Sequence, residues 1–391
     1  MRYKTIQLRQ GRLGRLRPGH QWIYKNQFRK APSLIKPGEC VSIVDSGGKF
    51  VGVGYYNPRS EISVRLLSFE EAVIDERFFL SRIDTAFRKR KLVLENTNAY
   101  RAVFSEADGL PGLIIDVYDN TAVFQALTLG METLKPFIIN AIRFVLKPRY
   151  IYEKSVSPFR KIEGMKDVNM WHGPAGNTVV EIREGQARFL VDIENGHKTG
   201  FYLDQRKSRL ALALLSKGKK VLDLFCYTGA FSVSAALGGA TRAIGVEIKN
   251  DWLKLAARNV ELNGVSGKVE FIAKDAFSAL KDISDSNEKF DVVIVDPPSF
   301  LKTRGELASA SKGYKRLNTL AMSVLNSGGI LATFSCSQNM PNELFSDVLK
   351  QAAKEALKPF TILKRCHQPE DHPIVKAIPE TEYLKGYFLK L

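Results

Sequence analysis

Cysteine and histidine are both scarce in this chain of 391 residues, and neither is clustered. The four cysteines lie far apart and lack the paired spacing of metal ligands, at Cys40, Cys226, Cys336 and Cys366. The five histidines are scattered as well. Disulfide frameworks and zinc sites both need cysteines at characteristic spacings. The sequence therefore predicts no disulfide framework, no metal site and a reducing, cytoplasmic location.

Long apolar runs are also missing. No stretch approaches the roughly 20 residues that a membrane-spanning helix needs. The first ten residues alternate charged side chains with isolated apolar ones, so we expect no signal peptide. No internal repeat or low-complexity tract is visible. We therefore expect a globular protein that is not associated with a membrane.

Acidic residues are the third shortage. The chain has 41 Asp and Glu against 58 Lys and Arg, a formal net charge of +17, and no acidic residue precedes Glu39. Such an excess favours an acidic polymer or surface as partner, and charge alone leaves RNA, DNA and an anionic membrane open. The candidate RNA contacts in the basic N-terminal stretch are Arg12, Arg15 and Arg17. A solvated basic face without a partner is the alternative.

Length and hydrophobic content predict two or three domains, each with a core of its own. Residues 1–72 hold short apolar segments between turn signals, which is typical of a small β-barrel. Residues 73–190 begin with helical periodicity over 74–95 and include an expected helix over 132–146, so they predict an α+β domain. Residues 191–391 alternate strands with helices, which predicts a mostly parallel, doubly wound sheet of the α/β class.

A candidate cofactor site follows the apolar segment at 221–225, which breaks at a tight turn and enters a helix. Such a turn lets backbone amides approach a ligand closely, and its candidate residues are Phe225, Tyr227, Thr228 and Gly229. The Gly-x-Gly-x-x-Gly pattern of a dinucleotide site is absent. We therefore do not expect a pyrophosphate to be held there.

Three acidic residues, Asp223, Glu247 and Asp275, end three successive predicted strands. In folds of this kind they meet at one sheet edge, where they suit a ligand with an amine, a ribose diol and an adenine amino group. S-adenosylmethionine carries all three. Each acid taken singly can instead cap the helix that follows it.

The motif Asp296-Pro297-Pro298 follows the predicted strand over 290–295, and Phe300 lies just beyond it. The prolines fix the turn and remove backbone donors, while the carboxylate can accept hydrogen bonds from a planar amine. Asp296 and Pro297 are also candidate cofactor contacts, and Pro298 and Phe300 are candidate contacts to the base. By itself this motif favours methylation of an exocyclic nitrogen.

Cys336 changes that balance, because it follows the apolar stretch 329–334 at the end of another predicted strand. Carbon 5 of a pyrimidine is a poor nucleophile, so an enzyme first adds a thiolate to carbon 6. Asp296 can move a proton at the edge of the ring to support this chemistry. A small buried side chain without a reaction is the alternative role for Cys336.

The stretch Asp223–Phe231, together with Glu247 and Asp275, resembles the ordered motifs of class I S-adenosylmethionine-dependent methyltransferases. Nearly the whole chain further resembles large-subunit ribosomal RNA cytosine-5 methyltransferases with an N-terminal PUA domain. The stretches that carry this closer resemblance are Gly19–Tyr24, Lys198–Arg206, Asp371–Pro373 and Tyr383–Gly386.

The resemblance implies an RNA-binding PUA module, an accessory central domain and Cys336 as nucleophile. It places Asp204, Gln205 and Arg206 beside the cofactor or substrate pocket, whereas the residues alone suggest that Asp204 caps a helix. His372 is a candidate RNA contact, with a structural role as the alternative. A sister group that methylates guanine lacks a cysteine after its Phe-Ser pair, so Cys336 favours cytosine.

Two other functions remain open from the sequence. One is methylation of a nitrogen of guanine or adenine in RNA, with Cys336 only structural. The other is a non-catalytic RNA-binding protein that keeps a cofactor fold as a scaffold. The sequence also leaves a homodimer open.

Overall fold

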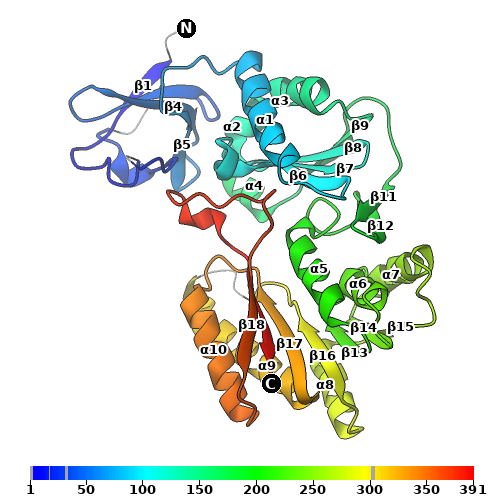
Figure 1. Cartoon of the computed structure of the whole chain (residues 1–391). Coiled ribbons are helices and arrows are strands. Elements are labelled where there is room, and N and C mark those ends of the chain that lie inside the picture. The colour runs from blue at the N-terminus through cyan, green and yellow to red at the C-terminus, as the bar shows by residue number, and fades with distance from the viewer. Residues whose placement is uncertain (1–2, 17, 31–33, 301–303) are drawn as a thin grey trace. The chain divides into compact units, whose positions relative to one another are not determined.

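The computed structural model describes residues 3–16, 18–30, 34–300 and 304–391, and Figure 1 shows the course of the chain. The chain folds into two compact units. The first unit comprises Met1–Ile182, Val191–Leu203 and Glu370–Thr381. The second unit comprises Arg183–Leu190, Asp204–Pro369 and Glu382–Leu391.

The first unit begins with a five-stranded sheet in the order β1-β3-β4-β5-β2. Its strands are β1 (Lys4–Gln7), β2 (Trp22–Tyr24), β3 (Cys40–Val44), β4 (Phe50–Tyr56) and β5 (Ile62–Ser68). Side chains alternate across a strand, so Val41 and Ile43 of β3 point into a core that also holds Val64 and Leu66. The short strands that the sequence predicts over this region are therefore present.

A second five-stranded sheet follows in the same unit, in the order β10-β9-β8-β7-β6. Its strands are β6 (Ala99–Phe104), β7 (Leu113–Tyr118), β8 (Thr121–Ala126), β9 (Tyr150–Ser155) and β10 (Val168–Trp171). Phe79 and Ile83 of α1 (Glu76–Lys91) pack in the core of this sheet. Tyr55 of the first sheet enters the same core and donates a hydrogen bond from its hydroxyl to the Pro111 carbonyl over 2.7 Å.

The single helix expected over 132–146 is broken in the structure. It consists of α2 (Leu129–Thr133), α3 (Lys135–Ala141) and a π-helical turn (Ile142–Leu146). Pro136 lies in the first turn of α3, where its missing N–H needs no partner. The expectation of one continuous helix was wrong because the proline starts a new helix at this point.

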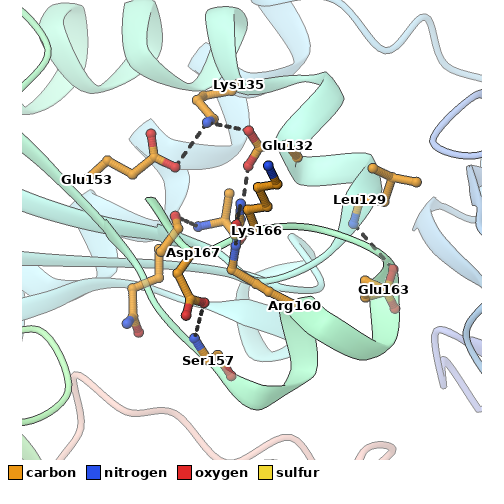
Figure 2. A network of polar contacts seen from close by, with 12 residues as sticks. Leu129, Glu132, Lys135, Glu153, Ser157, Arg160, Glu163, Lys166 and Asp167 are labelled. Carbon is orange, nitrogen blue, oxygen red and sulfur yellow. Dashed lines mark hydrogen bonds and ion pairs between the residues drawn. The ribbon is translucent and has the colours of Figure 1, made fainter. Parts of the chain in front are cut away.

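A buried polar network joins the helices and strands of this second sheet, as Figure 2 shows. Arg160 of α4 (Pro158–Glu163) donates to the carbonyl oxygens of Ala126 and Lys166 and forms an ion pair with Glu132 over 2.9 Å. Lys135 lies between Glu132 and Glu153, with N–O distances of 2.5 and 3.0 Å. The guanidinium therefore ties α2 and α4 to β8.

A two-stranded sheet of β11 (Val179–Glu184) and β12 (Ala187–Asp192) connects the two units along the chain. The hairpin turn lies at Gly185, and the glycine has a φ of +61°. This left-handed conformation favours glycine over other residues.

The second unit contains a seven-stranded sheet in the order β15-β14-β13-β16-β17-β19-β18. The parallel strands β13 to β17 run over Lys220–Leu224, Arg242–Glu247, Val269–Ala273, Phe290–Val295 and Leu325–Ser335. Strand β19 (Lys385–Lys390) pairs antiparallel with β17 and with β18 (Thr361–Cys366). The sequence predicts the parallel strands, but β18 and β19 were not among its expected strands.

Helices cover both faces of this sheet. Along β13, Leu222 and Leu224 face a core shared with α8 (Ala276–Asp285), α9 (Leu307–Ser323) and α10 (Asn342–Glu355). Asp223 faces the other side, where α6 (Ala230–Leu237) lies. The chain leaves β13 toward β14 and β15 and later returns to the opposite side as β16. Ligands of such sheets bind at this switch point, beyond the carboxyl ends of the strands.

Within the described ranges, no helix is both long and apolar enough to cross a membrane. The same part of the chain contains no group of three His, Cys, Asp or Glu side chains arranged to hold a metal ion.

Candidate active site

The turn between β13 and α6 has an unusual backbone. Phe225, Tyr227 and Gly229 have φ angles of +62°, +51° and +75°. A Cβ atom added at Gly229 would come within 2.9 Å of the Phe271 ring, so the turn has no room for a larger residue there. Left-handed conformations are costly for aromatic residues and cluster at functional sites. The turn is therefore compact, and it lies at the switch point of the sheet.

Asp223 is the central carboxylate of this site and is only 1% exposed. Its Oδ2 accepts hydrogen bonds from the backbone N and the Oγ of Ser232, over 3.0 and 2.7 Å. Its Oδ1 is buried and has no hydrogen-bond partner among the residues that the structure describes. Burial raises the pKa of Asp223 to about 7, and the carboxylates of Asp296 and Glu247 add to the rise. A buried carboxylate with an unpaired oxygen needs a cationic partner.

Glu247 ends β14 beside the turn and is half-buried. Its Oε2 accepts a hydrogen bond from the Tyr227 backbone N over 3.2 Å, and its Oε1 accepts one from Lys249 over 3.1 Å. The Tyr227 ring packs edge-on against Trp252, with centroids 4.9 Å apart. These contacts hold the carboxylate at the rim of the turn.

Asp275 has the helix-capping role that its position after a strand allows. Its Oδ1 accepts hydrogen bonds from the backbone N atoms of Phe277 and Ser278 at the start of α8, over 3.0 and 3.1 Å. It follows β15 by two residues and is the N-cap of α8. Its carboxylate is therefore oriented by the first turn of that helix.

Thr228 lies inside the same turn and is nearly fully buried. Its Oγ1 is buried and finds no hydrogen-bond partner in the described part of the chain. The carbonyl of Thr228 accepts a hydrogen bond from Nδ2 of Asn259 over 2.9 Å, which ties the turn to α7 (Asn250–Leu262). Within the described ranges, Asp223 at the end of β13 and Thr228 in the turn thus each contribute an unpaired polar oxygen.

Asp296 follows β16 directly, on the strand next to β13. Its Oδ2 accepts a hydrogen bond from Nε2 of the buried Gln205 over 3.0 Å. Pro297 is buried, Pro298 is exposed, and the half-buried Phe300 packs edge-on against Tyr314 with centroids 4.8 Å apart. The Asp-Pro-Pro motif thus starts at the same sheet edge as Asp223.

Cys336 follows the last residue of β17 and is half-buried. Residues Val295 and Thr333 are partners in the parallel pairing of β16 with β17, so Asp296 and Cys336 leave neighbouring strands at the same end of the sheet. The Oγ of Ser335 donates to the Tyr314 hydroxyl over 3.1 Å. Burial raises the pKa of Tyr314, and the nearby Cys336 and Asp296 both add to the rise.

The other three cysteines have surroundings that disfavour a thiolate. Burial raises the pKa of Cys40 to about 11, and it also raises the pKa values of Cys226 and Cys366. Cys226 lies in the cofactor turn, where Asp223 and Glu247 raise its pKa further. A thiol of this kind is a small packing residue.

The run Asp204, Gln205 and Arg206 lies at the start of α5 (Arg206–Leu215), and all three residues are buried. Asp204 is not the helix cap that the residues alone suggest: Gln205 occupies the cap position. The carboxylate of Asp204 instead accepts a hydrogen bond from the Tyr383 hydroxyl over 2.7 Å. The sequence contains no local signal for this pairing, because the two residues are far apart along the chain.

His372 lies in the interior of the first unit and is 1% exposed. Its ring centroid is 5.5 Å from that of Phe104. The neighbouring Asp371 accepts a hydrogen bond from the Arg101 backbone N over 3.0 Å, and its carbonyl accepts one from Arg90 over 3.0 Å. These contacts describe the structural role that the sequence left as the alternative to an RNA contact.

Arg12 and Arg15 are exposed on the N-terminal sheet domain, and Arg17 lies outside the described residues. Arg15 forms an ion pair with Glu380 over 2.6 Å. A basic hollow of about 310 Å³ also lies in this domain, and its cations belong to the basic N-terminal stretch of the sequence. Its lining combines cations with aromatic rings and consists of Arg9, Lys25, Phe28, Arg29, Lys30, Tyr56, Pro58 and Ser63.

Comparison with known proteins identifies two regions of the chain. Residues 6–69 match the PUA-like domain family, and residues 166–385 match the S-adenosylmethionine-dependent methyltransferase family. The expected fold class, a β-rich PUA-like domain with a Rossmann-like methyltransferase domain, is thereby confirmed.

Named relatives align along almost the full length. "Ribosomal RNA large subunit methyltransferase I" of Alteromonas mediterranea is 41% identical over 376 residues, covering 95% of this chain and 94% of the relative. The protein of the same name in Escherichia coli strain SMS-3-5 is 38% identical over 388 residues, covering 97% of both chains.

Two solved structures share the fold along the whole chain. One is described as a putative methyltransferase complexed with SAH, with a TM-score of 0.87 and 24% identity. The other is a putative SAM-dependent methyltransferase from Streptococcus mutans, with a TM-score of 0.85 and 24% identity. Each covers 99% of this chain and 100% of the other.

Proposed function

Because the chain belongs to the ribosomal RNA large subunit methyltransferase I family of S-adenosylmethionine-dependent enzymes, we propose that it methylates carbon 5 of a cytosine in large-subunit ribosomal RNA. Family membership makes it an enzyme rather than the non-catalytic scaffold that the sequence left open. The cofactor is S-adenosylmethionine. Cys336 is the nucleophile of the proposal, and Asp296 is its partner at the edge of the base.

One observation supports this assignment above the others. Cys336 and Asp296 leave the neighbouring parallel strands β17 and β16 at the same end of the sheet, and both raise the pKa of Tyr314. Asp296 also adds to the raised pKa of Asp223. The thiol of Cys336, the carboxylate of Asp296 that would transfer the proton and the carboxylate of Asp223 that would bind the cofactor cation therefore lie at one sheet edge.

The residues of the turn after β13 fit the cofactor. The unpaired Oδ1 of Asp223 would accept a hydrogen bond from the cofactor ammonium, and Glu247 would bind the ribose hydroxyls. Asp275 would face the adenine amino group, while Phe225, Tyr227, Thr228, Gly229 and Pro297 would form the walls. When bound, S-adenosylmethionine supplies a methyl group on a sulfonium sulfur and leaves as the neutral thioether.

The chain's own residues carry the remaining chemistry. The Cys336 thiolate forms a bond to carbon 6, and the electron pair of the carbon 5–carbon 6 bond becomes available at carbon 5. Asp296 supplies a proton at the ring edge while that electron density is held in the ring, and takes it back afterwards. Once carbon 5 carries the methyl group, a base removes its proton and the sulfur–carbon 6 bond breaks. The aromatic base and the thiolate are then restored.

The RNA-binding part of the proposal rests on the PUA-like domain and on charge. Arg12, Arg15 and Arg17, together with the basic hollow around Arg29 and Lys30, would contact phosphates of the RNA. Pro298 and Phe300 would seat the extruded base, and Asp204, Gln205 and Arg206 would border its pocket. His372, which is buried, would support the fold around such a contact rather than make it.

We place this reaction in the cytoplasm, where ribosomal RNA would be the partner. The proposal is the same for a monomer and for a homodimer, because every residue that it names lies on one chain.

The experiment is covalent trapping with a large-subunit ribosomal RNA transcript that contains 5-fluorocytidine. Fluorine at carbon 5 cannot leave as a proton does, so the adduct should persist and migrate as a protein–RNA band in a denaturing gel. Cys336→Ala should abolish both the band and methyl transfer. Cys366→Ala, a second half-buried thiol in the same unit, is the matched control and should keep both.

Nitrogen methylation is the second candidate, and the Asp-Pro-Pro motif favours it. If this candidate is right, Cys336→Ala should transfer methyl groups as well as the wild type does. The wild-type enzyme should then form no trapped adduct. Digestion of the product RNA to nucleosides would then show methylguanosine or methyladenosine in place of 5-methylcytidine.

A further inference from the structure

Lys385 is a buried lysine at the start of β19, the strand that pairs with β17 just before Cys336. In the antiparallel pairing of β17 with β19, Lys385 is the partner of Ser335, the residue before Cys336. The residue is only 7% exposed. Burying an ammonium group costs free energy unless other groups compensate it. The surroundings of Lys385 must therefore supply that compensation.

Two backbone carbonyls hold the ammonium in place. Nζ of Lys385 donates to the carbonyl oxygen of Ser337 over 2.6 Å and to that of Tyr383 over 2.8 Å. Ser337 is the residue after Cys336, so the lysine is bonded to the turn that carries the thiol. The side chain spans from the Ser335 side of this turn to its Ser337 side.

The acidic groups near Cys336 disfavour its thiolate, and a cation at Lys385 counteracts them. Asp296 follows β16 and Tyr314 belongs to α9, and the pKa of Tyr314 is raised by both Cys336 and Asp296; Glu382 acts on Lys385 in the same electrostatic way. Burial lowers the pKa of Lys385, whereas Cys336 and Glu382 favour its charged form. Attraction between two charges is mutual, so an ammonium that is stabilised by a thiolate also stabilises it. Removing that cation would take away the positive charge that Lys385 brings to the segment that carries the thiolate.

We propose that Lys385 is a positioning residue for Cys336: its ammonium fixes the turn from Ser335 to Ser337 and supplies the positive charge that keeps the sulfur ionised beside Asp296. This inference rests on the proposed function, in which Cys336 is the nucleophile. It adds a group that neither the sequence motifs nor the named families assign.

The test measures the ionisation of Cys336 directly, in the full-length protein without RNA or cofactor. Iodoacetamide alkylates thiolates, so the rate of alkylation at each cysteine, followed by peptide mass spectrometry across a pH series, yields the thiol titration curve. The variant Lys385→Gln keeps hydrogen-bond donors for the two carbonyls and removes the charge. Lys385→Arg keeps the charge.

Lys385→Gln should shift the titration of Cys336 upward by about one pH unit, which slows alkylation at neutral pH about tenfold. Lys385→Arg should stay within a factor of about three of the wild type, because the charge remains. The matched control is Lys358→Gln, which removes an ammonium bound to the Leu325 carbonyl at the opposite end of β17. That variant should leave the Cys336 titration unchanged.

An unshifted Cys336 titration in Lys385→Gln would overturn the inference, as would an equal shift in Lys358→Gln. This failure is distinct from failure of the proposed function, which is decided by Cys336→Ala in the trapping experiment. The pH profile of kcat/KM gives a second readout: its acidic limb should move upward in Lys385→Gln and stay in place in Lys358→Gln.

Discussion

Gln205 donates a hydrogen bond from Nε2 to Oδ2 of Asp296 over 3.0 Å and so joins two motifs that are separated by 91 residues. The amide is buried at the start of α5, and the carboxylate follows β16. The bond to Oδ2 fixes the orientation of the Asp296 carboxylate at the sheet edge. A side chain that transfers protons at a base needs such a fixed orientation.

We expect Gln205→Ala to lower kcat for methyl transfer about tenfold, because the carboxylate of Asp296 loses its orientation. The affinity for S-adenosylmethionine should change far less. Steady-state kinetics and calorimetry separate the two effects. Gln186→Ala, at an exposed glutamine in the hairpin turn, is the control and should match the wild type. An unchanged kcat in Gln205→Ala would contradict the assigned role.

Cofactor affinity should depend on pH through Asp223. Its pKa is about 7 in the folded chain, against 3.8 for an unperturbed side chain, so the folded state holds its proton over this interval. The group's contribution to stability is therefore full at pH below 3.8 and is lost as the pH rises toward 7. A cationic ligand binds the ionised form, so its affinity should rise over the upper part of this window.

Calorimetric titration of S-adenosylmethionine should show roughly 20-fold tighter binding at about pH 7.5 than at about pH 5.5. Asp223→Asn should bind weakly at both pH values and lose the dependence. The variant should also be more stable than the wild type near neutral pH without cofactor, because it removes an ionisable group that is buried. A pH-independent wild-type affinity would show that Asp223 does not pair with the cofactor cation.

The buried guanidinium of Arg160 should support the first unit and not the cofactor site. Arg160→Ala removes the donors for the Ala126 and Lys166 carbonyls and leaves Glu132 with Lys135 as its cationic partner in place of two. We expect a loss of about 3 kcal/mol in the stability of this unit, measured by hydrogen exchange of its strands. Affinity for S-adenosylmethionine should be retained. The exposed Lys161, next along α4, provides the control variant Lys161→Ala.

RNA binding should depend on the basic hollow of the PUA-like domain. If Arg29 and Lys30 contact phosphates, each alanine variant should lower the slope of log affinity against log salt by about 0.9 or less. Filter binding of a ribosomal RNA fragment over a salt series measures this slope. Lys254→Ala, an exposed lysine on α7, should leave it unchanged. Equal slopes in all three variants would place the RNA elsewhere.

Local patterns in the sequence were sufficient to predict much of the site. Asp223 and Glu247 were recognised because each ends a short apolar strand before a turn, and the structure brings both to one sheet edge. The same reasoning located Asp296 and Cys336. Pro136 was an equally local signal, but it was overlooked within an apolar helical pattern.

The remaining contacts depend on pairing between distant segments. Tyr383 binds Asp204, and Lys385 reaches the Ser337 carbonyl, because β19 inserts beside β17. Nothing near Lys385 in the sequence indicates that its side chain is buried. The register of an antiparallel strand pair decides which residues face each other, and the local sequence around Lys385 does not specify that register.

The antiparallel strand β19 follows β17 and β18 along the chain yet lies between them. β17 and β18 therefore cannot take their final positions in the sheet until β19 has entered between them. Before that insertion, the edge of β17 has unpaired backbone groups, and the turn at Cys336 lacks the ammonium that binds it. The segment at Cys336 is therefore complete only once β19, which comes later in the chain, is paired with β17.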